Sequence, residues 1–166
     1  MTFLIPSVYG HTTPHDRVRN RGPAPAALCA AIGDAGHGVE IWSGYTSRAG
    51  PDDSEPCSAV ARVISSGEPL DIGRLIFAAA HPAMLRRLWF SVGDGGDAGT
   101  AALLKASQYG IPQPCRPADL PAEITDPYVF PYLRPGDPQW QALDTALARC
   151  RGMFTDLGLI QPRGAG

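Results

Sequence analysis

Short apolar stretches alternate along this chain with polar segments rich in glycine and proline. Residues 2–8 are the first such stretch and predict a buried strand. The next stretch has helical spacing, ends before Gly36, and has one apolar face formed by Leu28, Ala31, Ile32 and Ala35. Residues 39–43 then alternate as in a strand, with Val39 and Ile41 on one face. A strand, a helix and a strand in this order predict a right-handed crossover and a parallel pair, with residues 39–43 as a central strand.

The middle of the chain is divided by residues that break regular structure. Residues 44–58 contain several glycines, prolines and aspartates and predict a loop, which leads into a short strand at 59–64. Asp71 is a suitable cap for a helix whose buried positions are Ile72, Leu75, Ile76 and Ala79. Pro82 predicts that this helix breaks near Ala80.

The segment that follows is ambiguous in its periodicity. Residues 87–92 fit a strand, but they also fit the end of a second helix. A run of glycine and aspartate at 93–100 comes next and leads into a helix that Gly110 ends.

The C-terminal part has few regular signals before its last helix. Residues 111–116 predict an edge strand, because their prolines cannot donate to a sheet. The connection at 117–136 is proline-rich, and residues 128–130 are its only strand candidate. Asp137 and Pro138 predict the start of a helix whose core stripe is Trp140, Leu143, Leu147, Cys150 and Phe154. Residues 161–166 predict a disordered tail.

These elements predict one α/β domain over residues 1–160, a three-layer Rossmann-like fold with a mostly parallel sheet. The chain has 166 residues, of which 44% are hydrophobic and 18% charged, a composition that argues against a disordered chain. Its 19 glycines and 17 prolines predict many turns. The net charge of −2 and the lack of a long apolar run argue against nucleic acid and membranes as partners.

The cysteines and the first residues indicate a cytoplasmic protein. The apolar start of the chain is interrupted by Pro6 and lacks a basic leader, so we expect no secretion signal. The four cysteines are far apart in the sequence and form no CxxC pair, which predicts free thiols. We expect Cys29 and Cys150 on the buried faces of helices.

The glycine- and aspartate-rich segment is the first candidate ligand site. Glycines allow backbone N–H groups to converge, and a helix N-terminus attracts an anion. Carboxylates would repel a phosphate and fit a ribose hydroxyl or a divalent metal better, and the alternative is a simple helix cap. The candidate ligand-binding residues here are Asp94, Gly96, Asp97, Gly99 and Thr100.

The loop after the first strand is the second candidate. His11 and Thr12 are its ligand-binding candidates, and His11, His15 and Asp16 could supply metal ligands. Pro14 makes the helix that would align the two imidazoles improbable, so we expect an exposed polar loop, no bound metal and no cofactor. If residues 87–92 form a strand, this loop and the glycine-rich one share the carboxyl edge of the sheet.

Residues 23–92 resemble a von Willebrand factor A-like family of unknown function from actinobacterial phages and mobile elements, and the stretches that carry the resemblance are 21–24, 35–42, 67–75 and 81–87. This resemblance implies a Rossmann-like fold. Residues 96–100 are similar to the threonine loop of its metal-binding members. Their DxSxS motif is absent, since residues 7–11 contain no carboxylate.

Residues 97–100, together with Ala106, Gly110 and Pro112, are similar to the ligand loop of nucleoside deoxyribosyltransferase-like nucleotide-binding families. Those enzymes have a nucleophilic glutamate three residues after the threonine. Leu103 stands at that position here, which disfavours the transfer chemistry.

Taken together, these patterns favour a phage or mobile-element accessory domain that binds a protein partner or a small ligand without catalysis. The alternative is a nucleotide-binding or nucleoside-processing protein that uses the Asp94–Thr100 loop.

Overall fold

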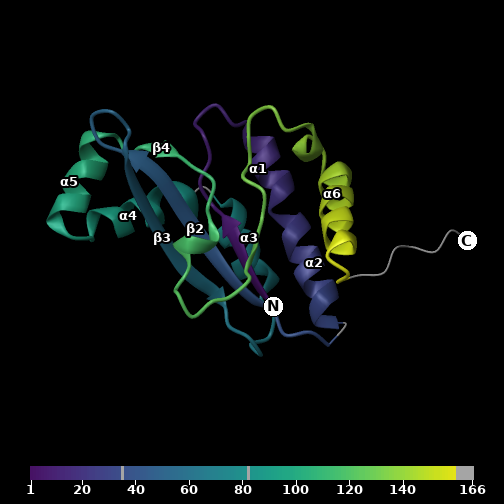
Figure 1. Cartoon of the computed structure of the whole chain (residues 1–166). Coiled ribbons are helices and arrows are strands. Elements are labelled where there is room, and N and C mark those ends of the chain that lie inside the picture. The colour runs from purple at the N-terminus through teal and green to yellow at the C-terminus, as the bar shows by residue number, and fades with distance from the viewer. Residues whose placement is uncertain (35, 82, 160–166) are drawn as a thin grey trace, which may run out of the picture.

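A mixed five-stranded sheet forms the centre of the protein in the computed structural model, which describes residues 1–34, 36–81 and 83–159 (Figure 1). The strand order is β3-β2-β1-β5, and β4 pairs with the far part of β2. Three strands run in one direction, namely β1 (Thr2–Pro6), β2 (Glu40–Ala49) and β5 (Tyr128–Val129). The two antiparallel strands are β3 (Glu55–Ile64) and β4 (Ile111–Pro112). The predicted α/β class and the mostly parallel direction of the strands are therefore confirmed.

The first crossover agrees with the expected strand–helix–strand unit. Two helices, α1 (His15–Arg21) and α2 (Pro23–Asp34), connect β1 to β2, and these two strands pair in parallel. Residues 39–43 do lie at the centre of the sheet. The predicted helix face is partly wrong, because Ala31 is exposed, whereas Leu28, Cys29 and Ile32 are buried as expected. Ala35 lies outside the described residues.

The loop predicted at 44–58 is wrong, because β2 and β3 form a long hairpin there. Gly44 does not break the strand. A side chain at Gly44 would lie 2.7 Å from the Cys115 sulfur, so this glycine allows another segment to pack on the sheet. The actual turn is short and includes two residues with positive φ, Gly50 at 96° and Asp53 at 54°.

Helix α3 (Ile72–Ala80) begins and ends where the sequence predicted. The Asp71 carboxylate accepts the Arg74 backbone N–H at 2.9 Å, which makes it an N-cap. Of the stripe expected on this helix, Leu75 and Ala79 are buried, whereas Ile72 is 46% exposed. The end of α3 at Ala80 agrees with the predicted break, and Pro82 itself lies outside the described residues.

The ambiguous segment at 87–92 is helical, so the strand interpretation is wrong. A π-helix, η1 (Ala83–Leu88), continues into α4 (Trp89–Asp94), and α5 (Ala98–Ala106) follows. Trp89 is buried against the sheet while Leu88 and Val92 are exposed. The tertiary contacts of one large aromatic residue therefore decide a segment that periodicity left open.

The last helix begins later than expected. Asp137 and Pro138 start a short 3₁₀ turn, η3 (Pro138–Trp140), and α6 spans Leu143–Asp156 after it. The Asp137 carboxylate accepts the Arg134 backbone N–H instead of capping α6. The predicted stripe is partly wrong, because Leu143 and Leu147 are exposed. The buried residues are Trp140, Ala146, Cys150, Met153 and Phe154.

The other predictions for the C-terminal part have mixed outcomes. The strand candidate at 128–130 is confirmed as β5. Only Ile111 and Pro112 of the edge strand predicted at 111–116 join the sheet. The predicted tail at 161–166 lies outside the described residues.

The two faces of the sheet have different covers. Helices α1, α2, α3 and α6 pack on one face over a large apolar cluster that includes Phe3, Ile41 and Phe154 (Figure 1). The other face is covered mainly by the irregular connection after β4, including the short 3₁₀ turn η2 (Pro117–Asp119), over Leu4, Cys115 and Leu120. The predicted three-layer Rossmann-like arrangement is thus not confirmed, because an irregular segment covers the face where the third layer would lie.

The cysteines are free thiols, as expected. Cys29 and Cys150 are both buried in the main core, and burial raises the pKa of Cys29 to about 12 and that of Cys150 to about 11. These two residues therefore act as small apolar side chains.

Candidate functional site

A buried hydrogen-bond network anchors the chain where β1 ends. The Ser7 hydroxyl donates to the Gly44 carbonyl at 3.0 Å and accepts from the Ser43 hydroxyl at 2.9 Å. It also accepts from Trp89 Nε1 at 2.8 Å, so α4 is tied to the same point. All of these groups are buried, where a hydrogen bond that is not made is costly. The network fixes the start of the loop that follows β1 against both β2 and α4.

A buried arginine also stabilises this edge of the sheet. Arg21 is 2% exposed and donates to the Pro6 carbonyl at 2.7 Å and the Pro131 carbonyl at 2.8 Å. Pro6 is the last residue of β1 and Pro131 follows β5, and these two strands are parallel neighbours. Burial lowers the pKa of Arg21 to about 10, so the group remains charged at neutral pH. The guanidinium therefore holds together the carboxyl ends of two strands.

A cavity of about 460 Å³ lies at this carboxyl edge, and we call it the edge cavity. Such an edge is where ligands usually bind in α/β sheets. The loop after β1, strand β2 and helix α4 each contribute residues to its wall. The turn between α5 and β4 completes the wall. The lining residues are Val8, Tyr9, His11, Tyr45, Phe90, Ser107, Gln108, Tyr109, Gly110, Ile111 and Pro112.

The turn that completes the wall is strained. Gln108, Tyr109 and Gly110 have φ values of 50°, 66° and 74°, three consecutive residues in the left-handed region. Such a conformation costs on the order of 1–3 kcal/mol for each residue other than glycine. A Cβ atom at Gly110 would lie 2.1 Å from the Arg48 carbonyl oxygen, so only glycine fits there.

Aromatic side chains hold this turn in place. The Tyr45 hydroxyl donates to the Tyr109 carbonyl at 2.6 Å. The Tyr109 ring stacks on Phe90 with centroids 3.9 Å apart and planes 11° apart. Its hydroxyl donates to Asp94, with oxygens 3.1 and 3.2 Å away. Burial raises the pKa of Tyr45, and desolvation together with Asp94 raises the pKa of Tyr109, so both hydroxyls stay protonated at neutral pH.

The structure separates the two loops that the sequence placed in one cleft. His11 lines the edge cavity, whereas Thr12 is exposed and does not line it. Gly96 and Thr100 line a second cavity of about 400 Å³, between α4, α5 and the start of β3, which we call the loop cavity. Tyr45 contributes to both walls. The loops do not meet because residues 87–92 are helical and α4 lies between them.

The glycine- and aspartate-rich loop has the geometry of a helix cap. Asp97 is the N-cap of α5, and its carboxylate accepts the Thr100 backbone N–H at 3.0 Å. The same carboxylate accepts the Thr100 hydroxyl at 2.5 Å. Gly99 lies within the first turn of α5, and Asp94 is the last residue of α4. The Thr100 groups expected to bind a ligand are therefore already used by Asp97.

Sequence reasoning missed the aromatic residues of the edge cavity. Tyr45 lay in a segment assigned to a loop, and Phe90 in one that could be either strand or helix. Tyr109 was missed because no sequence pattern predicts a tyrosine with positive φ. The neighbouring Gly110 was the only available signal, since a glycine after a helix often has positive φ.

Neither histidine pairing nor a carboxylate cluster gives a metal site in the described part of the chain. His15 lines a different cavity from His11. Among residues 1–34, 36–81 and 83–159, no group of three or more histidine, cysteine, aspartate or glutamate side chains could hold a metal ion.

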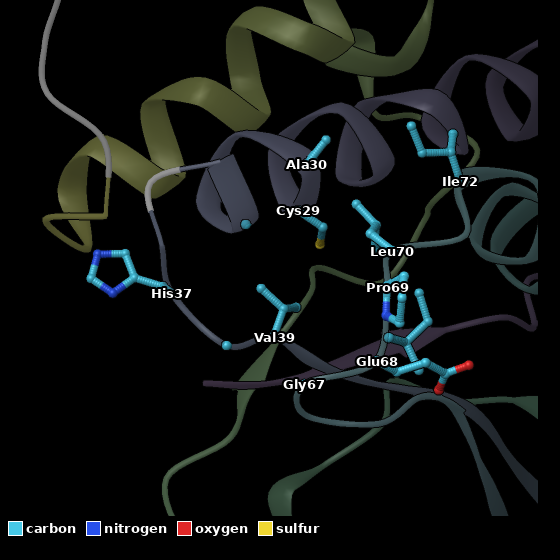
Figure 2. A pocket seen from close by; sticks show the side chains of 12 residues that line it. Cys29, Ala30, His37, Val39, Gly67, Glu68, Pro69, Leu70 and Ile72 are labelled. Atoms are coloured by element: carbon cyan, nitrogen blue, oxygen red, sulfur yellow. The ribbon is translucent and has the colours of Figure 1, made fainter.

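A cavity of about 490 Å³ lies between α2 and the loop from β3 to α3. Figure 2 shows Cys29, Val39 and Leu70 directed toward this space, whereas the Glu68 carboxylate points away from it. Glu68 is instead paired with Arg74 at 2.6 Å and accepts the Ser65 backbone N–H. The wall of this cavity thus consists largely of apolar core residues, and the cavity offers fewer groups for recognition than the edge cavity does.

No helix in the described residues is both long and apolar enough to cross a membrane.

Comparisons with known proteins identify a family and give no further information. No curated protein matches the chain, and no solved structure does. A family model described as a domain of unknown function, DUF7192, matches residues 1–161. Because this match spans nearly the whole chain, the protein belongs to that family.

Proposed function

We propose that this protein is a non-catalytic accessory domain of a phage or mobile element and that it binds a small planar ligand in the edge cavity. The family resemblance carried by residues 21–24, 35–42, 67–75 and 81–87 supports the biological setting. The observation that carries the binding function is the strained turn at 108–110, which builds an aromatic wall at the carboxyl edge of the sheet. Strained backbone of this kind concentrates at ligand sites.

The size and lining of the edge cavity support a small planar ligand. Its volume of about 460 Å³ lies within the range of ordinary ligand pockets. Tyr9, Tyr45, Phe90 and Tyr109 line it with aromatic rings, and such a lining favours a flat, mildly polar molecule such as a nucleobase. His11 is exposed at the rim, where its imidazole can donate or accept one hydrogen bond.

The hydroxyl groups in the lining support binding over catalysis. The Tyr45 hydroxyl donates to the Tyr109 carbonyl, and the Ser107 hydroxyl donates to the Leu103 carbonyl at 2.6 Å. The Tyr109 hydroxyl donates to Asp94. The Tyr45 and Ser107 hydroxyls are used by backbone carbonyls, so neither is paired with a general base as a nucleophile would be, and the Tyr109 hydroxyl is used to hold the turn against Asp94.

Thermal unfolding with a panel of nucleobases, nucleosides and nucleotides tests this function. A ligand at 100 times its Kd stabilises the folded state by about 2.7 kcal/mol, so a real ligand raises the Tm clearly. We expect His11→Ala to reduce that shift. The matched control is His37→Ala, because His37 is also exposed and lines the cavity of Figure 2 and not the edge cavity. A panel without any shift, or equal loss in both variants, contradicts the proposal.

A second candidate function is nucleotide binding at the loop cavity, by a domain of Rossmann-like ancestry. The observation that favours it is that Gly96 and Thr100, both predicted ligand residues, line one cavity with Tyr45 and Trp89. Thr100→Val separates the two candidates. A nucleotide affinity that falls in Thr100→Val and not in His11→Ala places the ligand in the loop cavity.

A further inference from the structure

An apolar groove lies between α1 and α3, and it shares no lining residue with the edge cavity or the loop cavity. Its volume is about 560 Å³, and its floor consists of Val18, Ile76 and Ala80. Phe77 lines the groove as well and is 38% exposed, so its ring offers apolar surface to a bound molecule. Of the two helices, α1 contributes His15, Val18 and Arg19, and α3 contributes most of the rest.

Close packing at one end of the groove fixes the separation of the helices. A Cβ atom at Gly22 would lie 2.6 Å from the Cβ of Ala80, so the chain after α1 touches α3 directly. Val18 is 3% exposed and belongs to the main core, so it holds α1 against the rest of the fold. The groove is therefore part of the packed fold, because its walls are set by core contacts.

Three basic or imidazole side chains surround this apolar floor. His15 and Arg19 are one helical turn apart on α1 and so lie on the same face. Arg19 forms no ion pair with any residue that the structure describes. None of the described residues that line the groove is acidic. The charge around the groove is consequently complementary to one anionic group.

His81 is held in one orientation at this rim. Its ring stacks on Phe77 with centroids 4.8 Å apart and planes 24° apart. Its Nδ1 accepts the Ala83 backbone N–H at 3.2 Å, so in the neutral ring the proton is on Nε2. The imidazole therefore keeps one N–H donor for a ligand while its other nitrogen serves the backbone.

We propose that this groove binds a free single-chain carboxylate, with the chain on the apolar floor and the carboxylate at Arg19, His15 and His81. One permanent positive charge with two imidazole donors matches a monoanion better than a phosphate dianion. An arginine can hold both oxygens of a carboxylate at once. The site is separate from the edge cavity and does not depend on the function proposed above.

Isothermal titration calorimetry with three twelve-carbon amphiphiles below their micelle concentrations tests the proposal. The probes are dodecanoate, dodecanol and dodecyltrimethylammonium, which share a chain and differ in charge. We expect dodecanoate to bind at one site per chain, dodecanol more weakly and the cation not at all. Equal affinity for all three, or no binding of dodecanoate, overturns the proposal.

Two variants locate the bound molecule. Arg19→Glu should weaken dodecanoate roughly tenfold or more, since a hydrogen bond to a charged group is lost and repulsion is added. Arg149→Glu is the matched control, because Arg149 is an exposed arginine of α6 outside the groove. Phe77→Ala should weaken dodecanoate and dodecanol alike. Equal losses in the Arg19 and Arg149 variants would place the carboxylate elsewhere and overturn the assignment.

A final measurement separates a free carboxylate from a membrane surface. Co-sedimentation with vesicles that contain an anionic phospholipid reports lipid docking, for which the groove would need to face a bilayer. Binding to vesicles in the absence of binding to dodecanoate overturns the proposal, and dodecanoate binding without co-sedimentation supports it.

Discussion

Two glycine-containing segments near α5 show opposite relations between sequence and structure. The loop at 93–100 is conspicuous in the sequence, with four glycines and two aspartates, yet it forms an exposed helix cap. The turn at 107–110 is inconspicuous, with one glycine, yet it has three consecutive left-handed residues and closes the edge cavity.

The difference shows that a glycine is required where a side chain would clash with its surroundings, whatever the number of glycines in the segment. A Cβ at Gly96 would lie 3.3 Å from the nearest carbonyl oxygen, Gly93 O, whereas a Cβ at Gly110 would lie 2.1 Å from Arg48 O. The first contact is relieved by a small shift. The second is blocked by the backbone of a central strand, which cannot move without disturbing the sheet.

The largest expected effect comes from a methyl group at Gly110. Gly110→Ala should reduce the free energy of unfolding by about 3 kcal/mol or more, because positive φ and a backbone clash act together. Gly96→Ala, its matched control, should change stability by less than about 1 kcal/mol. Urea unfolding of both variants measures the contrast, and similar values for the two would remove the distinction between the segments.

An intermediate effect is expected from the hydroxyl that supports the strained turn. Tyr45→Phe keeps the ring and removes the hydrogen bond to the Tyr109 carbonyl. We expect a loss of about 0.5–1.5 kcal/mol in urea unfolding, the usual net value of such a bond. Weaker binding in the edge cavity should accompany it. Full stability in this variant would mean that Phe90 stacking alone holds the turn.

A smaller effect should appear as pH dependence at the cap of α5. The Thr100 hydroxyl and backbone N–H lower the pKa of Asp97 below its ordinary value. The carboxylate therefore contributes stability above about pH 4, and this contribution is lost as the pH falls through the lowered pKa. The Tm difference between the wild type and Asp97→Asn should shrink between pH 7 and pH 3. A difference that stays constant would show that the carboxylate charge plays no part.

The smallest effect is expected from Thr100→Val. This residue donates to Asp97 at the protein surface, so stability should change by less than about 0.5 kcal/mol. Ligand affinity at the edge cavity should be unchanged. A tenfold loss of nucleotide affinity would instead favour the second candidate function and give the loop at 93–100 a role beyond capping.

Local signals in the sequence were sufficient where a single residue decides the outcome. Asp71 predicted the N-cap of α3, and the alternation at 39–43 predicted the central strand. The strand at 128–129 was found because it is the one apolar run in a proline-rich connection. Of the residues that line the edge cavity, the sequence named His11 as a ligand-binding candidate, and its role in binding stays a prediction.

The missed parts depend on contacts between distant residues. Gly44 is compatible with β2 because Cys115 packs over it, and this contact joins positions 71 residues apart. Trp89 is buried against Val8 and Tyr45, and Ser7 accepts its indole N–H. No window of neighbouring residues contains either contact, so propensity alone assigned a loop and an ambiguous segment.

By itself, the sequence determined the α/β class, the parallel β1–β2 pair and the capped start of α3, since these follow from hydrophobic periodicity and from local hydrogen bonds. Only the tertiary structure decided which loops share a cavity, which face of the sheet the helices cover and which glycine is irreplaceable. These properties depend on the close approach of segments far apart in the chain. The packing that permits or forbids such an approach is a property of the whole fold.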